Sequence, residues 1–241
     1  MKPIARVAVV VPAHDEGALI GRCLASVRRA LAHPAVAALD RRVVVVADRC
    51  ADDTAAVARR ALARGLACTI AQVDFASAGR ARAEGVARAL ARWPGADPAT
   101  TWLANTDADT CVPADWLARQ LQAAARDYAA VAGIVDVDSF AGHAHRLRLR
   151  RLFRSTYEIP EDRPHPHVHG CNLGVRGDAY LDARGWPAID LAEDHGLWNA
   201  IRARGWRCLS DRWLRVITSG RPLGRARGGF ADTLVALGAA S

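Results

Sequence analysis

Four short, continuously apolar runs, separated by helix-length amphipathic stretches, constrain the fold of this chain most. The runs read ARVAVVVP, RRVVVVA, LACTIAQV and TTWLANT, and most of their residues are β-branched or otherwise apolar. Strands that are apolar on both faces, each followed by a helix, are typical of a parallel sheet covered on both sides. The first half of the chain therefore predicts a β-α-β-α-β-α-β order and an α/β fold with a Rossmann-like, doubly wound, mainly parallel sheet.

The stretches between these runs carry helix-boundary signals. Ser77 can cap the helix expected over residues 78–93, and the Pro94-Gly95 pair ends it. The other predicted elements are a helix over 17–31, a helix from Asp52 or Asp53, a helix whose first turn holds Pro113 and Asp115, and a fifth strand in YAAVAGIVDV. The second half is less regular, with a basic amphipathic stretch over 146–154, a Pro/His-rich loop and a mixed α/β tail.

Length and cysteine content set broad limits. A chain of 241 residues fits one large domain, over 1–241, better than two small ones. Its apolar runs are far shorter than the roughly 20 residues that cross a bilayer. The N-terminus reaches Pro12 and His14 too soon for a secretory leader, so we expect a cytoplasmic protein. Six cysteines without a C-x-x-C pair indicate reduced thiols, not a zinc knuckle or a disulfide framework.

The basic charge has two explanations. A net charge of +8 suits a polyanionic partner such as nucleic acid, an anionic lipid or a phosphorylated substrate. Lys2 is the only lysine, however, and Arg and Ala recur along the whole chain. A GC-rich coding bias explains much of such basicity, so the charge alone does not identify a partner.

Three acidic clusters follow strands of the predicted sheet. PAHDE follows the first strand, DRCADDT the second and DAD the fourth. Any one of them reads equally well as a solvated turn with a helix cap. In open parallel sheets, however, ligands bind in the crevice outside the carboxyl ends of the strands, where all three clusters would meet. Together they predict a binding site at this edge of the sheet.

A crevice lined with Asp and Glu repels phosphate unless a cation lies between them. Mg²⁺ or Mn²⁺, which prefer oxygen ligands, would bridge carboxylate and diphosphate oxygens. On an extended segment residues i and i+2 point the same way, so we expect Asp107 and Asp109 to face one metal together. The sequence therefore predicts a metal-diphosphate site.

Taken in order, these motifs resemble those of the inverting family 2 glycosyltransferases, which have the nucleotide-sugar-binding GT-A fold. VVVPAHDE is similar to the family's Pro-Ala-x-Asn-Glu, with Asp15 in the Asn place. Asp48, Asp52 and Thr54 match Asp-x-Ser-x-Asp-x-Thr, with Cys50 replacing the Ser, and both replacements bear on donor identity. The later motifs are AGRARAEGV, Thr106 to Asp109, GCNLGVRGDAY with GW, and LAEDHGLWNAIRARGWR. The resemblance covers almost the whole chain and implies a nucleotide-sugar-binding half over 1–110 and an acceptor-binding half over 111–241.

The resemblance also implies a role for each matching residue. Asp109 would coordinate Mn²⁺ or Mg²⁺, Asp107 would hold the ribose or share the metal, and Asp194 would be the general base. The nucleotide of the donor, expected to be a UDP-sugar, would contact Pro12, Ala13, His14, Glu16, Asp48, Gly79 and Arg80, with Asp48 reading the uracil-like edge. The acceptor side would be formed by His169, Gly170, Asn172, Glu193 and Arg221.

An inverting transfer needs a carboxylate that takes the proton from the acceptor hydroxyl as it attacks the anomeric carbon. Glu193 and Asp194 are adjacent, so we expect them to diverge at a helix start, with only Asp194 pointing into the site. The alternative is that both acids serve the helix dipole. Processive synthases carry Gln-x-x-Arg-Trp and membrane helices, whereas Arg212-Trp213 here lacks the Gln. This departure predicts transfer of one sugar to a soluble or surface-presented hydroxyl acceptor, without polymerisation.

Three weaker signals lie in the second half. The histidines at 165, 167, 169 and 195 lack the spacing of a structural zinc site, and they favour an acceptor-side lid with His169 as a metal or acceptor contact. HRLRLRRLFR could bind phosphate or a membrane surface, or be a solvated helix face. TSGRPLGRARGG resembles the mobile C-terminal segment that closes over nucleotide sugars, with Arg221 as the expected diphosphate or acceptor contact.

Other classes of function stay open. A non-catalytic basic protein that binds nucleic acid or an anionic membrane surface would bind with steep salt dependence and ignore nucleotide sugars. A dinucleotide oxidoreductase is disfavoured because G-x-G-x-x-G does not follow the first strand, and a nucleotidyltransferase would need a Gly-rich loop there. We expect no nucleic-acid partner and at most peripheral membrane contact, and the sequence leaves a homodimer open.

Overall fold

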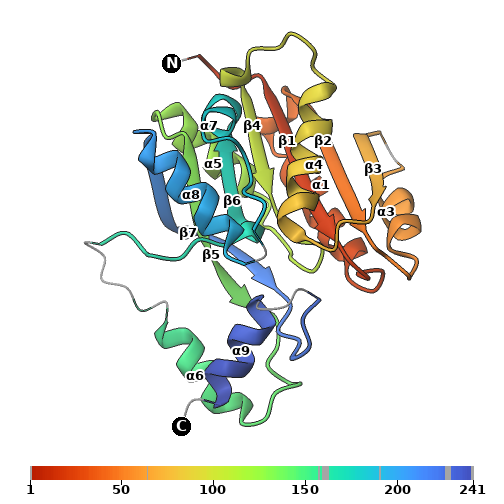
Figure 1. The fold of residues 1–241 in the computed structure, drawn as a ribbon, viewed down its shortest axis with the longest axis vertical. Coiled ribbons are helices and arrows are strands. Elements are labelled where there is room, and N and C mark those ends of the chain that lie inside the picture. Colours follow the sequence, from red (N-terminus) through yellow and green to blue (C-terminus); the bar gives the residue numbers. More distant parts are fainter. Residues whose placement is uncertain are drawn as a thin grey trace.

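The protein folds around one seven-stranded sheet, shown by the computed structural model (Figure 1). The structure describes residues 2–63, 65–156, 158, 163–189, 191–225 and 229–239. The strands are β1 (Arg6–Ala13), β2 (Asp40–Asp48), β3 (Ala67–Val73), β4 (Thr101–Asn105), β5 (Ala130–Val137), β6 (Leu173–Arg176) and β7 (Cys208–Thr218). Their order in the sheet is β3-β2-β1-β4-β6-β5-β7.

The pairing of the strands confirms the predicted mainly parallel sheet. Among the described strands, β1 pairs in parallel with β2 and β4, β2 with β3, and β5 with β7. Only β6 runs antiparallel, to β4 on one side and to β5 on the other. The predicted fifth strand is β5, but it does not lie beside β4, because β6 from later in the chain is inserted between them.

Most of the predicted helices are present. They are α1 (Ile20–Leu31), α2 (Pro34–Ala37), α3 (Thr54–Leu62), α4 (Ala78–Ala91), α5 (Trp116–Ala125), α6 (Arg146–Ser155), α7 (Gly177–Asp182), α8 (Glu193–Ala203) and α9 (Phe230–Ala239), with 3₁₀ turns η1 (Pro98–Thr100) and η2 (Gly170–Asn172). Ser77 caps α4 as predicted, since its hydroxyl accepts from the Arg80 N–H. The first helix starts at Ile20, not Gly17, because residues 17–19 form a turn before it. The N–H groups of Glu16 and Gly17 bond to the side chains of Thr54 and Asp52. The third predicted helix ends two residues early, at Ala91.

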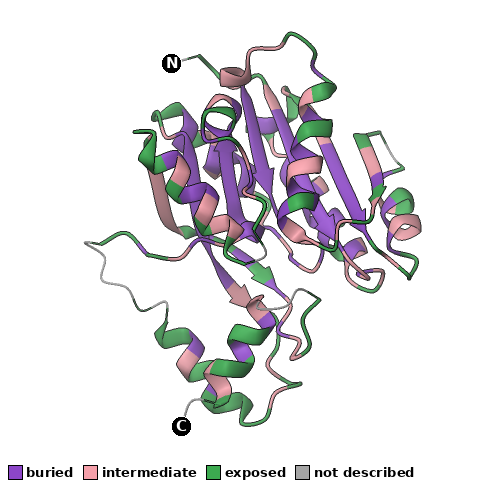
Figure 2. Ribbon diagram, in the orientation of Figure 1, coloured by how far each residue is buried: buried purple, intermediate pink, exposed green. Residues whose placement is uncertain are grey.

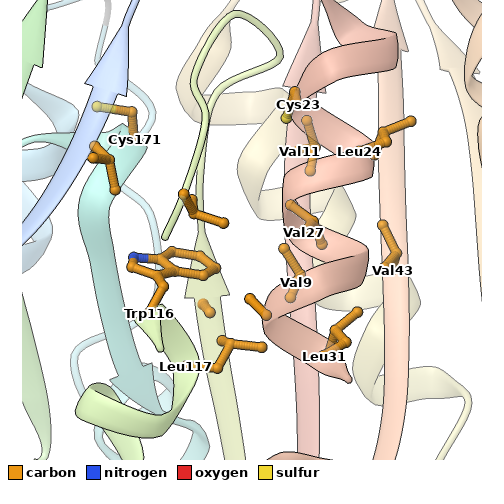
Figure 3. Packing of buried hydrophobic residues seen from close by; sticks show 14 of the residues in the cluster. Val9, Val11, Cys23, Leu24, Val27, Leu31, Val43, Trp116, Leu117 and Cys171 are labelled. Carbon is orange, nitrogen blue, oxygen red and sulfur yellow. The ribbon is translucent and has the colours of Figure 1, made fainter. Parts of the chain in front are cut away.

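Alternate residues of the central strands feed two apolar layers, one on each face of the sheet. Val9 and Val11 of β1 belong to the layer that holds α1, α3 and α5, whereas Val10 belongs to the layer of α4, α7 and α8. Figure 3 shows Leu24 and Val27 of α1 lying over this part of the sheet. Figure 2 shows the buried sheet between helices that are exposed on their outer sides. Each Å² of apolar surface that is removed from water stabilises the folded protein by about 25 cal/mol, so these two layers are the main source of its stability.

Helices α6 and α9 pack against each other at one end of the molecule, away from the central strands (Figure 1). We call this pair the α6–α9 lobe. Leu149 and Phe153 of α6 are buried in it, and Phe153 meets Phe230 edge-on with ring centroids 6.0 Å apart. No helix in the described part of the chain is long and apolar enough to cross a membrane. All six cysteines are free thiols, as predicted.

Candidate active site

The acidic clusters meet at the carboxyl ends of β1 and β2. Asp15, in the loop after β1, accepts the backbone N–H of Ala51 at 2.7 Å, and the N–H of Gly17 donates to Asp52 at 2.9 Å. These bonds join two loops that are about thirty-five positions apart in the sequence. Because neighbouring parallel strands end on the same edge, the register of β1 and β2 brings the two loops together.

Asp107 and Asp109 lie in a turn after β4, not on the extended segment that the sequence predicted. The N–H of Thr110 donates to the Asp107 carbonyl at 3.0 Å, which closes the turn. Strand β4 stops at Asn105, and Cys111 exchanges two backbone hydrogen bonds with Ile217 of β7. This bridge turns the chain back towards the sheet. The two carboxylates are near enough to interact, since the charge of Asp107, after burial, contributes to the raised pKa of Asp109.

Arg221, in the segment after β7, joins the acids that follow β1 and β4. Its Nη1 donates to Glu16 Oε2 at 2.8 Å, and its Nη2 also bonds to Glu16 and lies 3.2 Å from Asp109 Oδ2. Thr218 donates to Asp109 Oδ1 at 3.3 Å. The predicted residues Glu16, Asp109 and Arg221 therefore form one connected cluster, which sequence separation alone would not reveal.

Arg82 is a second cation at the site, although the AGRARAEGV motif pointed only to Arg80. The residue is only 4% exposed. Its Nη2 donates to Asp107 Oδ1 at 2.7 Å, and its Nη1 bonds to the Glu193 carboxylate. Arg80, which was predicted to lie against the nucleotide, is exposed, and its guanidinium carbon lies 4.4 Å from the centre of the Phe75 ring. Helical spacing could have found Arg82, because it shares the buried face of α4 with Val86 and Ala89.

Two predicted glycines pack around the ion pair of Arg82 and Glu193. A Cβ on Gly170 would lie 2.6 Å from Arg82 Nη2, so only the bare backbone fits against the guanidinium there. A Cβ on Gly79 would come within 3.2 Å of Glu193 Cγ. These close contacts explain why small residues occupy both positions.

Asp48 and His14 hold loops at the end of β2. The Asp48 carboxylate is buried and accepts N–H groups of Phe75, Ala76 and Ser77 at 2.6, 3.1 and 2.9 Å. These bonds fix the segment that starts α4. His14 Nδ1 donates to the Asp48 carbonyl at 2.7 Å, beside the end of β1 at Pro12 and Ala13.

Asn172 does not lie with the predicted acceptor residues. Its side chain is fully buried, and its amide donates to the carbonyls of Ile134 and Leu214 at 2.9 and 2.8 Å. Its Oδ1 accepts from Trp116 Nε1 at 2.9 Å. Asn172 therefore ties β5, β7 and α5 together inside the core.

The histidines at 165, 167 and 169 form a stack, with successive ring centroids 6.0 and 5.9 Å apart. Burial, with smaller contributions from the neighbouring histidines, lowers the pKa of His169 to about 3, so its ring is neutral. Rings stacked in this way are unlike the tetrahedral arrangement of a zinc centre. Residues 159–162 of the predicted lid and 226–228 of the predicted C-terminal segment lie outside the described residues.

Both acids at the start of α8 contact site residues, whereas the sequence predicted that only one would point inward. Glu193 is paired with Arg82. Asp194 Oδ2 accepts the N–H of Gly170 at 3.0 Å, and its Oδ1 accepts the N–H of His195 at 2.7 Å. The two carboxylates therefore differ in their partners, since one faces a cation and the other faces neutral N–H groups.

The charges at the site favour a further cation. Four carboxylates, of Glu16, Asp107, Asp109 and Glu193, contact two guanidiniums. Burial first, and then the charge of Asp107, raise the pKa of Asp109 to about 6, although Arg221 opposes the shift. A divalent cation with oxygen ligands would compensate such carboxylates. Asp109 and Asp107 therefore fit the predicted Mn²⁺ or Mg²⁺.

A second cluster of possible metal ligands fits a structural role better than a metal site. Asp15, Cys50 and Asp52 place potential ligand atoms within 4.8 Å of one another. Asp15 and Asp52 already accept backbone N–H groups of the facing loop, and Cys50 contacts the Ala13 carbonyl at 3.4 Å. These bonds give the cluster a structural role, because they connect the loop after β1 to the loop after β2.

The raised pKa of Asp109 predicts a pH-dependent stability. The pKa is near 3.8 in the unfolded chain and about 6 in the folded protein, so the folded state binds more protons between these values. Stability that is present below about pH 4 is therefore lost as the pH rises through about 6. As the pH rises through this range, we expect the free energy of unfolding of the wild type to fall by about 3 kcal/mol relative to that of Asp109→Asn. Urea unfolding of both proteins in EDTA measures this difference, and a difference that does not vary with pH would contradict the prediction.

Comparisons with known proteins agree with this geometry. The family model described as Glycosyl transferase family 2 matches residues 8–182. Among solved structures, the mannosyltransferase PcManGT from Pyrobaculum calidifontis, in complex with GDP-Man and Mn²⁺, is similar with 21% identity and a TM-score of 0.66, over 93% of this chain and 61% of that one. S. aureus TarS in complex with UDP is similar with 16% identity and a TM-score of 0.60, over 90% of this chain and 61% of that one. The search of curated proteins gave no match.

The chain spans about three fifths of the length of these two structures. At such low identity the likeness shows the fold, and it confirms the predicted GT-A arrangement of strands and helices. The family match is independent of the likeness in fold and runs from β1 to the end of α7. Since it covers well over half of the sequence, the chain belongs to glycosyl transferase family 2.

Proposed function

We propose that the protein is a metal-dependent inverting glycosyltransferase that moves one sugar from a nucleotide-diphosphate sugar to a hydroxyl acceptor. The observation that carries this proposal is the environment of Asp109, a largely buried carboxylate with a raised pKa beside Asp107. Both lie at the carboxyl edge of the sheet, where α/β folds bind ligands. The complexes of similar structures with GDP-Man and Mn²⁺ and with UDP support a nucleotide-sugar donor.

On the donor side, the N-terminal half, 1–110, would hold the nucleotide, and we expect a UDP-sugar. The loops around Ala13, His14 and Asp48 are joined by hydrogen bonds, so a base and ribose would meet a preformed surface. Asp109, with Asp107, would hold Mn²⁺ or Mg²⁺, which when bound stabilises the charge on a departing diphosphate. Arg221 contacts Glu16 and Asp109, and it would also contact a diphosphate oxygen.

On the acceptor side, the C-terminal half, 111–241, would supply Asp194 as the general base. Glu193 is the poorer candidate because its carboxylate is already paired with the buried Arg82. Among the described residues, the Asp194 carboxylate accepts from neutral N–H groups, so it keeps lone pairs for the proton of an acceptor hydroxyl. Arg82 would act as a positioning residue, since it fixes Glu193 next to Asp194 and orients Asp107 on the donor side.

The proposal is tested by thermal shift with UDP-, GDP- and dTDP-sugars, each with Mn²⁺, with Mg²⁺ and with EDTA. A nucleotide sugar at about a hundredfold its Kd stabilises the folded state by about 2.7 kcal/mol, which is a rise of several degrees in Tm. We expect this rise only when donor and metal are both present. A donor that stabilises equally in EDTA would refute the metal dependence, and the absence of any shift would refute nucleotide-sugar binding.

A further inference from the structure

Among the described helices, α6 of the α6–α9 lobe holds the most arginines. Helix α6 has five arginines and no acidic residue in ten positions. Leu149 and Phe153 face α9, and the residues on the opposite side are exposed (Figure 2). We call this exposed side the outer face of α6, formed by Leu147, Arg150, Arg151 and Arg154.

The outer face combines unpaired charge with one exposed apolar side chain. Arg150, Arg151 and Arg154 have no acidic partner among the described residues, and Asp232 is the only acid on the adjoining α9. Leu147 is 65% exposed, and helical spacing of four and seven residues places it in line with Arg151 and Arg154. The face therefore presents three guanidiniums around a leucine.

This combination suits a lipid surface better than a nucleic acid. Long arginine side chains reach phosphate groups while a leucine among them enters the interface. The outer face has no aromatic residue on which a base could stack. The buried side of α6 is already covered by α9, so contact with a bilayer would be electrostatic adsorption and not insertion of the whole helix.

The lobe is also connected to the candidate active site. Asp138, directly after β5, accepts from Arg22 at 2.7 Å and from the Gly220 N–H at 3.0 Å, next to Arg221. A pocket of about 410 Å³ runs from Asp138 to the start of α6, where Arg146, Leu147 and Arg150 line it. A surface held by the outer face would therefore lie near the segment that carries Arg221 in the candidate active site.

From charge complementarity and the exposed leucine, we propose that the outer face of α6 docks the protein on an anionic lipid bilayer, with lipid phosphates bound by Arg150, Arg151 and Arg154. This docking would present the site to acceptors at that surface. Each arginine near an anionic membrane strengthens binding about fivefold, so three together contribute about a hundredfold. The effect is expected to weaken at high salt, because mobile ions screen exposed charges.

The test is co-sedimentation of the whole protein with vesicles of phosphatidylcholine alone or with roughly one third phosphatidylglycerol. We expect binding to the anionic vesicles only, and an affinity about a hundredfold lower for R150Q/R151Q/R154Q. The matched control, R29Q/R92Q/R202Q, removes equal charge from exposed positions on α1, α8 and the C-cap of α4, and it should stay within about threefold of the wild type. Leu147→Ser should weaken binding to vesicles several-fold without changing binding to a soluble polyphosphate.

Three results would overturn the proposal: equal binding to neutral and anionic vesicles, equal losses in the two triple variants, or no binding to vesicles. Binding of single-stranded DNA without binding of vesicles would assign the face to nucleic acid instead. All the replaced side chains are exposed, so circular dichroism should show unchanged folding. The assay contains no donor, and its failure would leave the proposed transfer reaction untouched.

Discussion

Asp109→Asn is expected to lower kcat/KM for sugar transfer by about a thousandfold and to abolish the stabilisation by donor and metal together. The asparagine keeps the size of the side chain but loses the negative charge that a divalent cation requires. The raised pKa of Asp109 shows that burial and Asp107 already disfavour this charge in the folded protein. The variant should therefore be folded, more stable than the wild type near neutral pH, and inactive.

The matched variant for this experiment is Asp194→Asn. It removes the proposed base, which lies on α8 and bonds to Gly170, but leaves the Asp107–Asp109 turn unchanged. We expect it to lose transfer while keeping the thermal shift with donor and metal. If Asp109→Asn still binds metal and donor, Asp109 is not a metal ligand. If Asp194→Asn loses donor binding, Asp194 does not act in transfer alone, and the proposed separation between donor binding by Asp109 and proton removal by Asp194 is wrong.

Arg82→Gln is expected to lower the free energy of unfolding by about 3–5 kcal/mol, because it leaves two carboxylates without their cation. Arg82 is 4% exposed, and its guanidinium contacts both Asp107 and Glu193. For a protein of this length the loss corresponds to a fall of about 10 °C in Tm. Urea unfolding monitored by tryptophan fluorescence measures the change.

The neighbouring Arg80 gives the control, since it lies on the same helix but is exposed over Phe75. Arg80→Gln should change stability by less than about 1 kcal/mol. Adding Glu193→Gln to Arg82→Gln should restore part of the loss, because the second change removes one of the stranded charges. Equal effects of the Arg80 and Arg82 variants, or no rescue in the double variant, would contradict the ion-pair account.

Much of the fold was predictable because it depends on local patterns. The apolar runs at 5–12, 41–47, 66–73 and 100–106 correspond to β1 to β4, and Ser77 marks the start of α4. The position of β6 was not predictable in this way. It pairs with β4 about seventy residues earlier in the chain, and its four residues carry no period that distinguishes antiparallel from parallel pairing.

The candidate site was predictable in part for the same reason. Strand ends are local features, so the sequence alone determined that acids follow β1, β2 and β4, and parallel geometry required these ends to meet. Which cation neutralises which acid was decided only by the tertiary structure. Arg82 reaches Glu193 across 111 positions, and Arg221 reaches Glu16 across 205. Coulomb attraction depends on distance in space and on burial, and neither is encoded in residue type or local spacing.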